Sequence, residues 1–237
     1  MGGTDYHLAT IILALAISFF TFQKITFLID SYRGLTTENS FLNYSLFVPF
    51  FPQLIAGPIV HHSEMLPHFT QAKTFRFRPR NVNTVLAIFA LGLFKKAVLA
   101  DGIVVYANLV FDAADAGQAF TFLEAWTGAP ACTFQLYFDF SGYSDMALAP
   151  ARMFGIRLPM NFNSPYKATS IIESWRRWHI TLSRFLRDYV YIELGGNRKG
   201  RARRRVKLMA TMLIGGLWHG AGWTFAAWGA LHGFCVS

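Results

Sequence analysis

The chain has 237 residues, of which 53% are hydrophobic and 16% aromatic, and its mean hydropathy is +0.32. These values exceed ordinary usage in soluble globular domains, so they favour lipid over water as the surrounding solvent. The net charge of +9 does not indicate nucleic-acid binding, because the basic residues flank apolar segments and form no recognisable binding motif.

Apolar runs near the ~20 residues that span a bilayer occur first at Leu8–Phe22, Phe41–Val60 and Val82–Phe111. The first run lacks a signal-peptide cleavage site and predicts a membrane helix. The second holds three prolines, so it predicts a broken or re-entrant segment. The third carries Lys95 and Lys96, which either face a polar bundle interior or snorkel at helix ends.

The second half of the chain changes character along its length. An apolar segment at Phe120–Phe138 follows a turn, and residues 143–194 alternate polar and apolar side chains as amphipathic and re-entrant elements do. Two apolar helical stretches at Val206–Trp218 and Trp223–Val236 surround a glycine-rich break. Cys132 and Cys235 have no metal-type spacing, so we expect neither a disulfide framework nor a bound metal or cofactor.

Basic residues gather in two segments. Residues 198–207 read RKGRARRRVK, with seven basic residues and no acid, and residues 73–80 add four more. The positive-inside rule places both segments on the cytoplasmic side of a membrane. Attraction of anionic lipid headgroups is a secondary expectation.

The segment at 175–191 carries aromatic and apolar residues at helical spacing. A single helix there would place Trp175, Trp178, His179 and Leu182 on one side, with arginines such as Arg176 largely elsewhere. We expect this helix to lie at the membrane interface with His179 pointing inward among the aromatics. The alternative for His179 is a core histidine satisfied by one hydrogen bond.

The segment GGLWHGAGWTFAAWGALHG at 215–233 has only His219 and His232 as ionisable groups. An ionisable residue in an apolar membrane segment is a functional hypothesis by default. The glycines beside His219 permit close approach of a substrate, and an imidazole with a pKa of ~6.5 suits a general base. His219 is therefore the leading catalytic candidate, and His232 is a weaker one.

The segment YFDFSGYSDMA at 137–147 puts Asp139, Ser141 and Asp145 among aromatic residues. Either acid is suited to orient a histidine or to pair with one of the nearby arginines. The alternative is a capping and turn cluster around Gly142, and the residues alone leave both interpretations open.

Several motifs together resemble the membrane-bound O-acyltransferases, in particular the alginate O-acetylation branch and its peptidoglycan and teichoic-acid relatives. The motifs follow one another in that family's order and cover nearly the whole chain. They are ISFFTFQKITFLIDSYRG at 17–34, PQLIAGPIV at 52–60, GLFKKAVLAD at 92–101, YFDFSGYSDMA, MNFNSPY at 160–166, WRRWHITLSRFLRDYVYIELGGNR at 175–198 and the glycine-rich segment at 215–233.

The resemblance implies an all-α fold, a polytopic membrane helix bundle with re-entrant and amphipathic interfacial helices, in one domain over residues 1–237. It implies His219 as the family's invariant histidine and His179 as the second catalytic position. The substrate-binding positions expected with them are Asp139, Ser141, Asp145, Asn163, Trp175, Arg176, Trp178 and Trp218.

The implied activity is transfer of acetyl from a cytoplasmic donor, acetyl-CoA or another acyl thioester, toward hydroxyls of an exported polysaccharide. The expected setting is the inner membrane, with a periplasmic acetyltransferase as partner. Alternatives are a membrane conduit that feeds a separate transferase, and an inactive truncated homologue, since the family extends beyond both ends of this chain. Ala149-Pro150 departs from the family's Gly-Leu, and Pro150 is expected to break a helix there.

Overall fold

A computed structural model describes residues 17–36, 40–54, 57–71, 74, 79–198, 200–220 and 222–237. Within these ranges every regular element is a helix, which confirms the predicted all-α class. Most of the apolar run Leu8–Phe22 and most of the basic segment at 73–80 lie outside the described residues.

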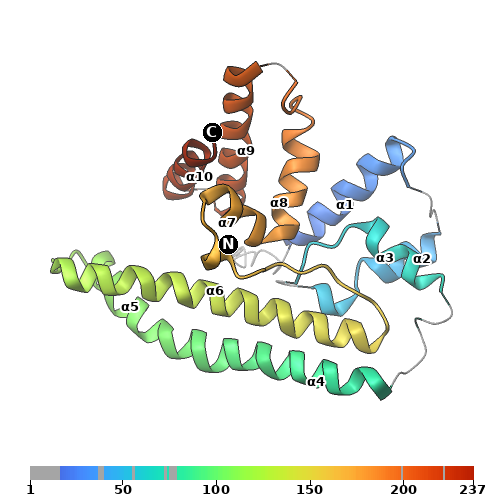
Figure 1. Ribbon diagram of the computed structural model, residues 1–237, viewed down its shortest axis with the longest axis horizontal. Coiled ribbons are helices and arrows are strands. Elements are labelled where there is room, and N and C mark those ends of the chain that lie inside the picture. The colour runs from blue at the N-terminus through green and yellow to red at the C-terminus, as the bar shows by residue number, and fades with distance from the viewer. Residues whose placement is uncertain are drawn as a thin grey trace, which may run out of the picture.

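The longest feature is a helical hairpin along one edge of the molecule (Figure 1). Helix α4 (Pro79–Phe94) continues through a π-helix, η2 (Lys95–Ala100), into α5 (Asp101–Asp115), as the apolar run predicts. Helix α6 (Phe122–Met153) returns alongside all three. A reciprocal capping box between Thr121 and Glu124 satisfies backbone groups where α6 begins.

The two arms of this hairpin touch backbone to backbone. A Cβ atom added at Gly142 would lie 2.7 Å from the carbonyl oxygen of Gly92 and 2.9 Å from the amide nitrogen of Lys96. Gly142 lies inside α6 and allows this helix to pack closely against α4 and η2. The interpretation as a turn cluster is therefore wrong. The predicted break at Pro150 is also wrong, because Pro150 lies in the last turn of α6, which ends at Met153.

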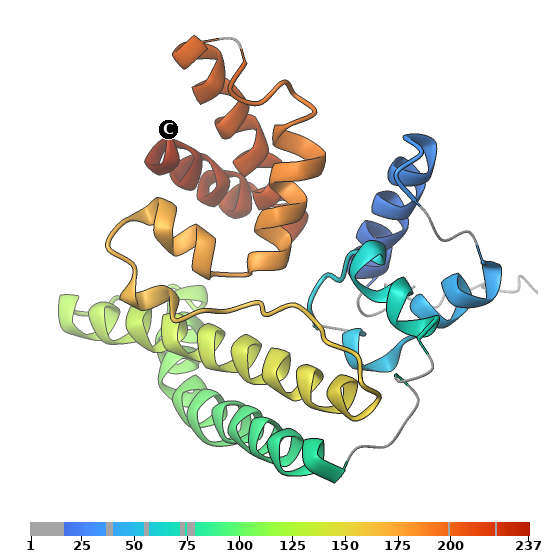
Figure 2. The same ribbon diagram turned by 45° about the vertical axis from the view of Figure 1, so that its right-hand side comes forward.

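The N-terminal helices form a second group beside one end of α6 (Figure 2). They are α1 (Ile17–Tyr32), α2 (Phe41–Phe47), the 3₁₀ turn η1 (Phe51–Gln53) and α3 (His62–Phe69). The proline-rich run is broken, as predicted. Phe47, Val60, Met65 and Leu66 form the core of this group together with Ala151, Ile156 and Leu158.

Helix α1 has its polarity reversed relative to a helix of a soluble protein. Gln23, Thr26 and Asp30, spaced three and four residues apart, are buried. Leu28 on another face is 65% exposed. Polar groups that face protein and apolar groups that face outward are the arrangement expected of a helix in contact with lipid.

The C-terminal helices form the third group, beside the other half of α6 (Figures 1 and 2). They are η3 (Pro165–Lys167), α7 (Ile171–Arg177), α8 (Ile180–Leu186), the π-helix η4 (Arg187–Tyr191), α9 (Gly200–His219) and α10 (Trp223–Val236). Gly216 and Gly229 let α9 and α10 approach closely. The last two helices and the break between them match the prediction.

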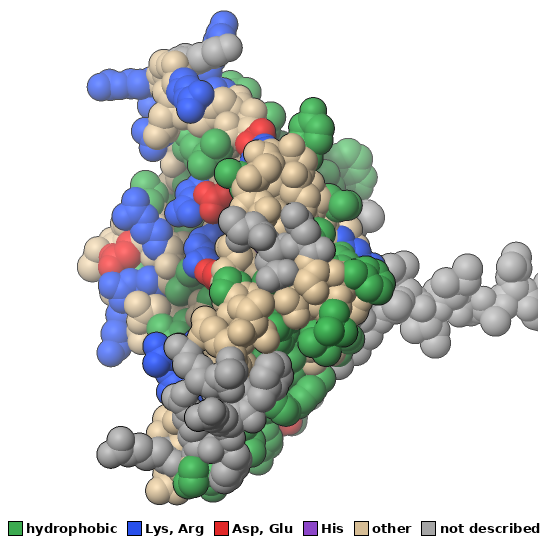
Figure 3. Space-filling view, turned by 90° about the vertical axis from the view of Figure 1, so that its right-hand side faces the viewer, with side chains coloured by type: hydrophobic (Ala, Val, Ile, Leu, Met, Phe, Trp, Pro, Cys, Tyr) green, Lys and Arg blue, Asp and Glu red, His purple; other side chains and the backbone are tan. Residues whose placement is uncertain are grey.

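The surface is divided by side-chain type. In Figure 3 lysine and arginine side chains gather along one edge, and hydrophobic side chains gather along the opposite edge. Many large apolar residues are exposed, among them Leu109 at 66%, Leu123 at 73% and Phe234 at 76%. Among the described residues, no helix is both long enough and apolar enough to span a membrane.

Candidate functional site

His219 is the last residue of α9 and stands where that helix meets the glycine break. Its side chain is exposed, so reactants have access to the ring. Aromatic rings surround the rest of it: the centroid of Trp218 lies 4.8 Å away, that of Trp228 5.1 Å and that of Phe225 6.5 Å. The imidazole is therefore held against a wall of aromatic carbon with one side open.

His179 has the opposite setting, because it is 3% exposed. It stands between α7 and α8 with φ 41° and ψ 55°, a left-handed conformation that non-glycine residues rarely adopt. The prediction of one continuous helix through residue 179 is therefore wrong. The ring of His179 packs edge-on against Phe140 at 4.7 Å and against Trp218 at 6.2 Å.

The unusual backbone at His179 is held by neighbours distant in sequence. The Ile180 amide donates to the carbonyl of Asn161 at 2.9 Å, and the Thr181 hydroxyl donates to Oδ1 of Asn161 at 2.6 Å. Asn161 is 1% exposed and donates from Nδ2 to Ser144 at 3.3 Å. A strained φ/ψ costs ~1–3 kcal/mol and persists only where its surroundings enforce it, often at functional sites.

Trp218 links the two histidines, since both rings contact it. Beyond His219, the ring of Trp228 leads to His232 at 4.4 Å, and Nε1 of Trp175 donates to Nδ1 of His232 at 3.1 Å. We call these six residues the histidine–tryptophan cluster: Trp175, His179, Trp218, His219, Trp228 and His232.

Four residues of the cluster were predicted as site residues: Trp175, His179, Trp218 and His219. The sequence predictions for the other two residues differed. His232 was a weaker candidate, and Trp228 was not predicted, although it stands four residues before His232 on one face of α10. Trp178 is close by in an aromatic group with Tyr137, Phe162 and Tyr166.

The predicted acids lie elsewhere, on the α4–α6 hairpin. Asp145 pairs with Lys95 at 2.7 Å, and Asp139 pairs with Lys96 at 2.5 Å. The prediction that these acids orient a histidine or pair with an arginine is therefore wrong, because their partners are lysines. Lys95 and Lys96 both pair with acids of α6, and Lys96 also pairs with Asp101 of α5 at 2.8 Å, so the polar-interior interpretation of these lysines fits the structure.

Three further predicted residues are placed as follows. Ser141 is buried in α6, and its hydroxyl has no hydrogen-bond partner among the described residues. Asn163 has an exposed side chain and uses its backbone amide to bond the carbonyl of Arg177 at 2.9 Å. Arg176 is exposed. Their roles in substrate binding stay predictions, and Asn161 occupies the buried position next to His179.

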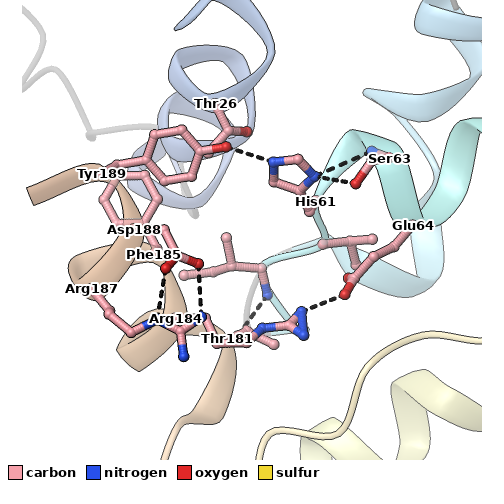
Figure 4. Close-up of a pocket in the computed structure, with 12 residues that line it drawn as sticks. Thr26, His61, Ser63, Glu64, Thr181, Arg184, Phe185, Arg187, Asp188 and Tyr189 are labelled. Atoms are coloured by element: carbon pink, nitrogen blue, oxygen red, sulfur yellow. Dashed lines mark hydrogen bonds and ion pairs between the residues drawn. The ribbon is translucent and has the colours of Figure 1, made fainter. Parts of the chain in front are cut away.

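A separate pocket of about 270 Å³ opens between α1, the start of α3 and α8 with η4 (Figure 4). Two ion pairs lie at its wall, Arg184 with Glu64 and Arg187 with Asp188. His61 points toward Tyr189, and Nε2 of His61 lies 2.6 Å from the Tyr189 hydroxyl. The lining of the pocket is about equally polar and apolar, and the arginines in it are already paired.

Asp30 and His62 stand behind this pocket, on α1 and the eight-residue α3. Burial lowers the pKa of His62 to about 4, and the neighbouring charge of His61 adds to that shift while Asp30 opposes it. Burial and the hydrogen bond to Asp30 raise the pKa of Tyr189. At neutral pH this group therefore includes an uncharged His62 imidazole and an uncharged Tyr189 phenol.

Residues 31–237 match the sequence profile described as MBOAT, membrane-bound O-acyltransferase family. The chain belongs to this family. The match includes all six residues of the histidine–tryptophan cluster, and it confirms the resemblance on which the expected site was based.

Three relatives illustrate the range of this acyltransferase family. The chain is 50% identical to the peptidoglycan O-acetyltransferase of Helicobacter pylori, over 96% of the chain and 47% of that protein. It is 44% identical to the probable alginate O-acetylase AlgI of Pseudomonas aeruginosa, over 100% and 44%. It is 30% identical to the teichoic acid D-alanyltransferase of Streptococcus thermophilus, over 92% and 55%. The chain thus spans about half the length of these relatives.

Proposed function

We propose that this chain carries the reaction centre of a membrane-bound O-acyltransferase that moves acetyl toward hydroxyls of an exported polysaccharide. The observation that carries the proposal is the pairing of an accessible imidazole, His219, with a buried and strained one, His179, across Trp218. Strain and burial concentrated at a histidine in this setting are typical of a reaction centre.

The chemistry of the proposed step needs one proton acceptor and one thioester. His219 accepts the proton of an acceptor hydroxyl while the oxygen forms a bond to the thioester carbonyl carbon. The carbon–sulfur bond then breaks, and the thiolate takes the proton from the imidazolium, so the thiol leaves and His219 is regenerated. Such general-base assistance contributes typically ~10²–10⁴-fold. His179 and Trp218 position the His219 ring.

The donor and acceptor are proposed from the names of the relatives and from the chemistry. Two relatives are named as O-acetylating enzymes, one for peptidoglycan and one for alginate. Acetyl-CoA or another acyl thioester is the proposed donor, and a polysaccharide hydroxyl is the acceptor. A periplasmic acetyltransferase is the proposed partner that completes transfer outside the membrane.

The proposed location is the inner membrane, with several passes. The inward-facing polar stripe of α1 and the large exposed apolar residues support contact with lipid. Separation of basic from apolar side chains on the surface agrees with a basic side toward the cytoplasm (Figure 3).

The test is acetyl transfer by membranes that contain the chain together with the proposed periplasmic partner, supplied with labelled acetyl-CoA and an acceptor polysaccharide. His219→Ala should lower transfer by ~10²-fold or more, since it removes the proton acceptor. The control is His68→Ala, which removes a histidine from α3, outside the cluster.

Three outcomes are informative. Transfer by the parent and by His68→Ala, with loss in His219→Ala, supports the proposal. Transfer that persists in His219→Ala contradicts it and points to a conduit that serves a separate transferase. Absence of transfer by the parent chain, in membranes where its expression is verified, contradicts the assignment of a complete reaction centre to these residues.

A further inference from the structure

Three side chains outside the histidine–tryptophan cluster bring potential metal ligands to one point. They are Asp30 near the end of α1 and His61 and His62 at the start of α3. Nε2 of His61 lies 2.9 Å from Oδ2 of Asp30, and Nε2 of His62 lies 3.8 Å from the same oxygen. One ligand atom from each residue falls within 4.8 Å of the other two.

Asp30 and His62 are buried, and His62 is incompletely satisfied. Asp30 is 5% exposed and His62 is 2% exposed. Nδ1 of His62 has no hydrogen-bond partner among the described residues. In the part of the chain that the structure describes, its Nε2 has the Thr36 hydroxyl at 3.5 Å and the distant Asp30 oxygen as polar neighbours. A buried imidazole aimed at a carboxylate, yet too far away for a good hydrogen bond, needs another partner between them.

The spacing suits a metal ion. Zinc binds imidazole nitrogen and carboxylate oxygen at ~2.0–2.2 Å, so adjacent ligand atoms around it stand roughly 3–3.5 Å apart. The separations of 2.9 and 3.8 Å bracket this range. Two imidazoles and one carboxylate are also a recurrent ligand set for divalent transition metals.

The neighbours supply the hydrogen bonds that orient metal ligands. The Ser63 hydroxyl lies 2.6 Å from Nδ1 of His61, and the Ser63 amide donates to the same nitrogen at 3.3 Å, so Ser63 orients the His61 ring. The Tyr189 hydroxyl donates to Oδ2 of Asp30 at 2.7 Å. The same hydroxyl contacts Nε2 of His61, and an entering ion would displace that contact.

We propose that Asp30, His61 and His62 bind one divalent transition-metal ion of the zinc class. Three protein ligands leave a fourth position for water, and the pocket lined by His61 and Tyr189 gives an entry path (Figure 4). The ion would join the end of α1 to the start of α3. The site contains no cysteine, so the spacing of cysteines in the sequence could not indicate it. The proposed metal site does not depend on the proposed acyl transfer.

The test uses the 237-residue chain purified in detergent, stripped with a chelator and then offered Zn²⁺ alone. Metal content, measured by plasma mass spectrometry after gel filtration, should reach one zinc per chain. Asp30→Asn and His62→Ala should lose this zinc. His68→Ala, which removes a histidine from the same helix, should keep it. Co²⁺ in place of zinc should give a visible absorption band typical of nitrogen and oxygen coordination.

A milder variant guards against loss of fold in the ligand variants. Ser63→Ala keeps all three ligands and should weaken zinc affinity by ~10–100-fold, as loss of an outer hydrogen bond typically does. The proposal is overturned if the parent binds no zinc above a metal-free blank. Equal binding by a folded His62→Ala variant, or unchanged affinity in Ser63→Ala, would also overturn it.

Discussion

Two histidines that both contact Trp218 illustrate how differently the same side chain can be used. The ring of His219 is open on one side and contacts aromatic carbon on the others. His179 is buried with a left-handed backbone. An open ring can meet a substrate proton, whereas a buried ring held by strain is suited to keep its neighbour in position.

Glu173 gives a pH-dependent prediction at the residue scale. This carboxylate is in the seven-residue α7, too short to span a membrane, and accepts hydrogen bonds from the amide and hydroxyl of Thr169 at 2.9 and 3.0 Å. The Thr169 amide, the Thr169 hydroxyl and then Arg177 lower its pKa from 4.5. The stabilisation is therefore present above pH 4.5 and is lost as the pH falls through the lower pKa of the folded state.

Glu173→Gln should accordingly lower the thermal unfolding midpoint at neutral pH, and the gap from the parent should close in acid. Glu193→Gln is the matched comparison, since it removes a half-exposed ion pair with Arg33 and should change the midpoint little. A Glu173→Gln deficit of equal size at neutral and acid pH would contradict the assignment.

Sequence patterns located the candidate histidines but not their local geometry. The spacing of Trp175, Trp178 and His179 fits one helical face only if the helix is continuous. The break at His179 depends on Asn161, which lies eighteen residues earlier and holds the backbone by hydrogen bonds. Helical periodicity contains no information on such a contact. The family resemblance favoured Asn163, which lies two residues after the buried Asn161.

At the element scale, the hairpin of α4, η2, α5 and α6 shows which features sequence can predict. Apolar length indicated a helix across residues 83–111, and it is present. The partners of Lys95 and Lys96 on α6 were left open because Asp145 and Asp139 come 50 and 43 residues later on another helix, whereas the third acid, Asp101, follows Lys96 by five residues. The local sequence pattern predicted the helices, whereas the ion pairs between helices follow from how the helices pack.

The close approach at Gly142 yields a prediction with an internal contrast. Gly142→Ala would place a methyl group 2.7 Å from the Gly92 carbonyl oxygen, so the hairpin arms must separate. The expected loss of unfolding free energy is ~1–3 kcal/mol, the usual cost of overpacking. Gly102→Ala on α5 meets nothing within 4 Å and should raise stability by ~0.5–1 kcal/mol through helix propensity.

Denaturant unfolding in detergent would measure both glycine variants. The two substitutions add the same atom to the same hairpin, so their opposite signs separate packing from propensity. Equal effects of the two would show that the arms do not touch at Gly142.

At the scale of the whole molecule, charge and apolarity are sorted to different sides (Figure 3). The start of α9 carries Arg201, Arg203, Arg204 and Arg205, all exposed. The composition predicted lipid contact and the basic runs predicted a cytoplasmic side. The reversed polarity of α1 agrees with lipid contact. The cytoplasmic side of the basic residues can be tested by a topology measurement.

Labelling of a single cysteine provides that measurement. In a chain with Cys132→Ser and Cys235→Ser, Ala202→Cys should resist a membrane-impermeant maleimide in intact cells and react in inverted vesicles. Changing the four arginines at 201, 203, 204 and 205 to glutamine should increase labelling in intact cells. Strong labelling of Ala202→Cys in intact cells with the arginines present would place this segment outside.

The wide turn of η2 has a consequence for how the hairpin is encoded. A π-helix takes up about one residue more than an α-helix over the same turn. Had Lys95–Ala100 wound normally, every later side chain of α5 would be rotated by about 100° around the axis. The apolar repeat of α4 therefore does not carry into α5, and a repeat counted through both would lose phase at residue 95. Helices α4 and α5 therefore have separate registers, and the π-helix η2 joins them.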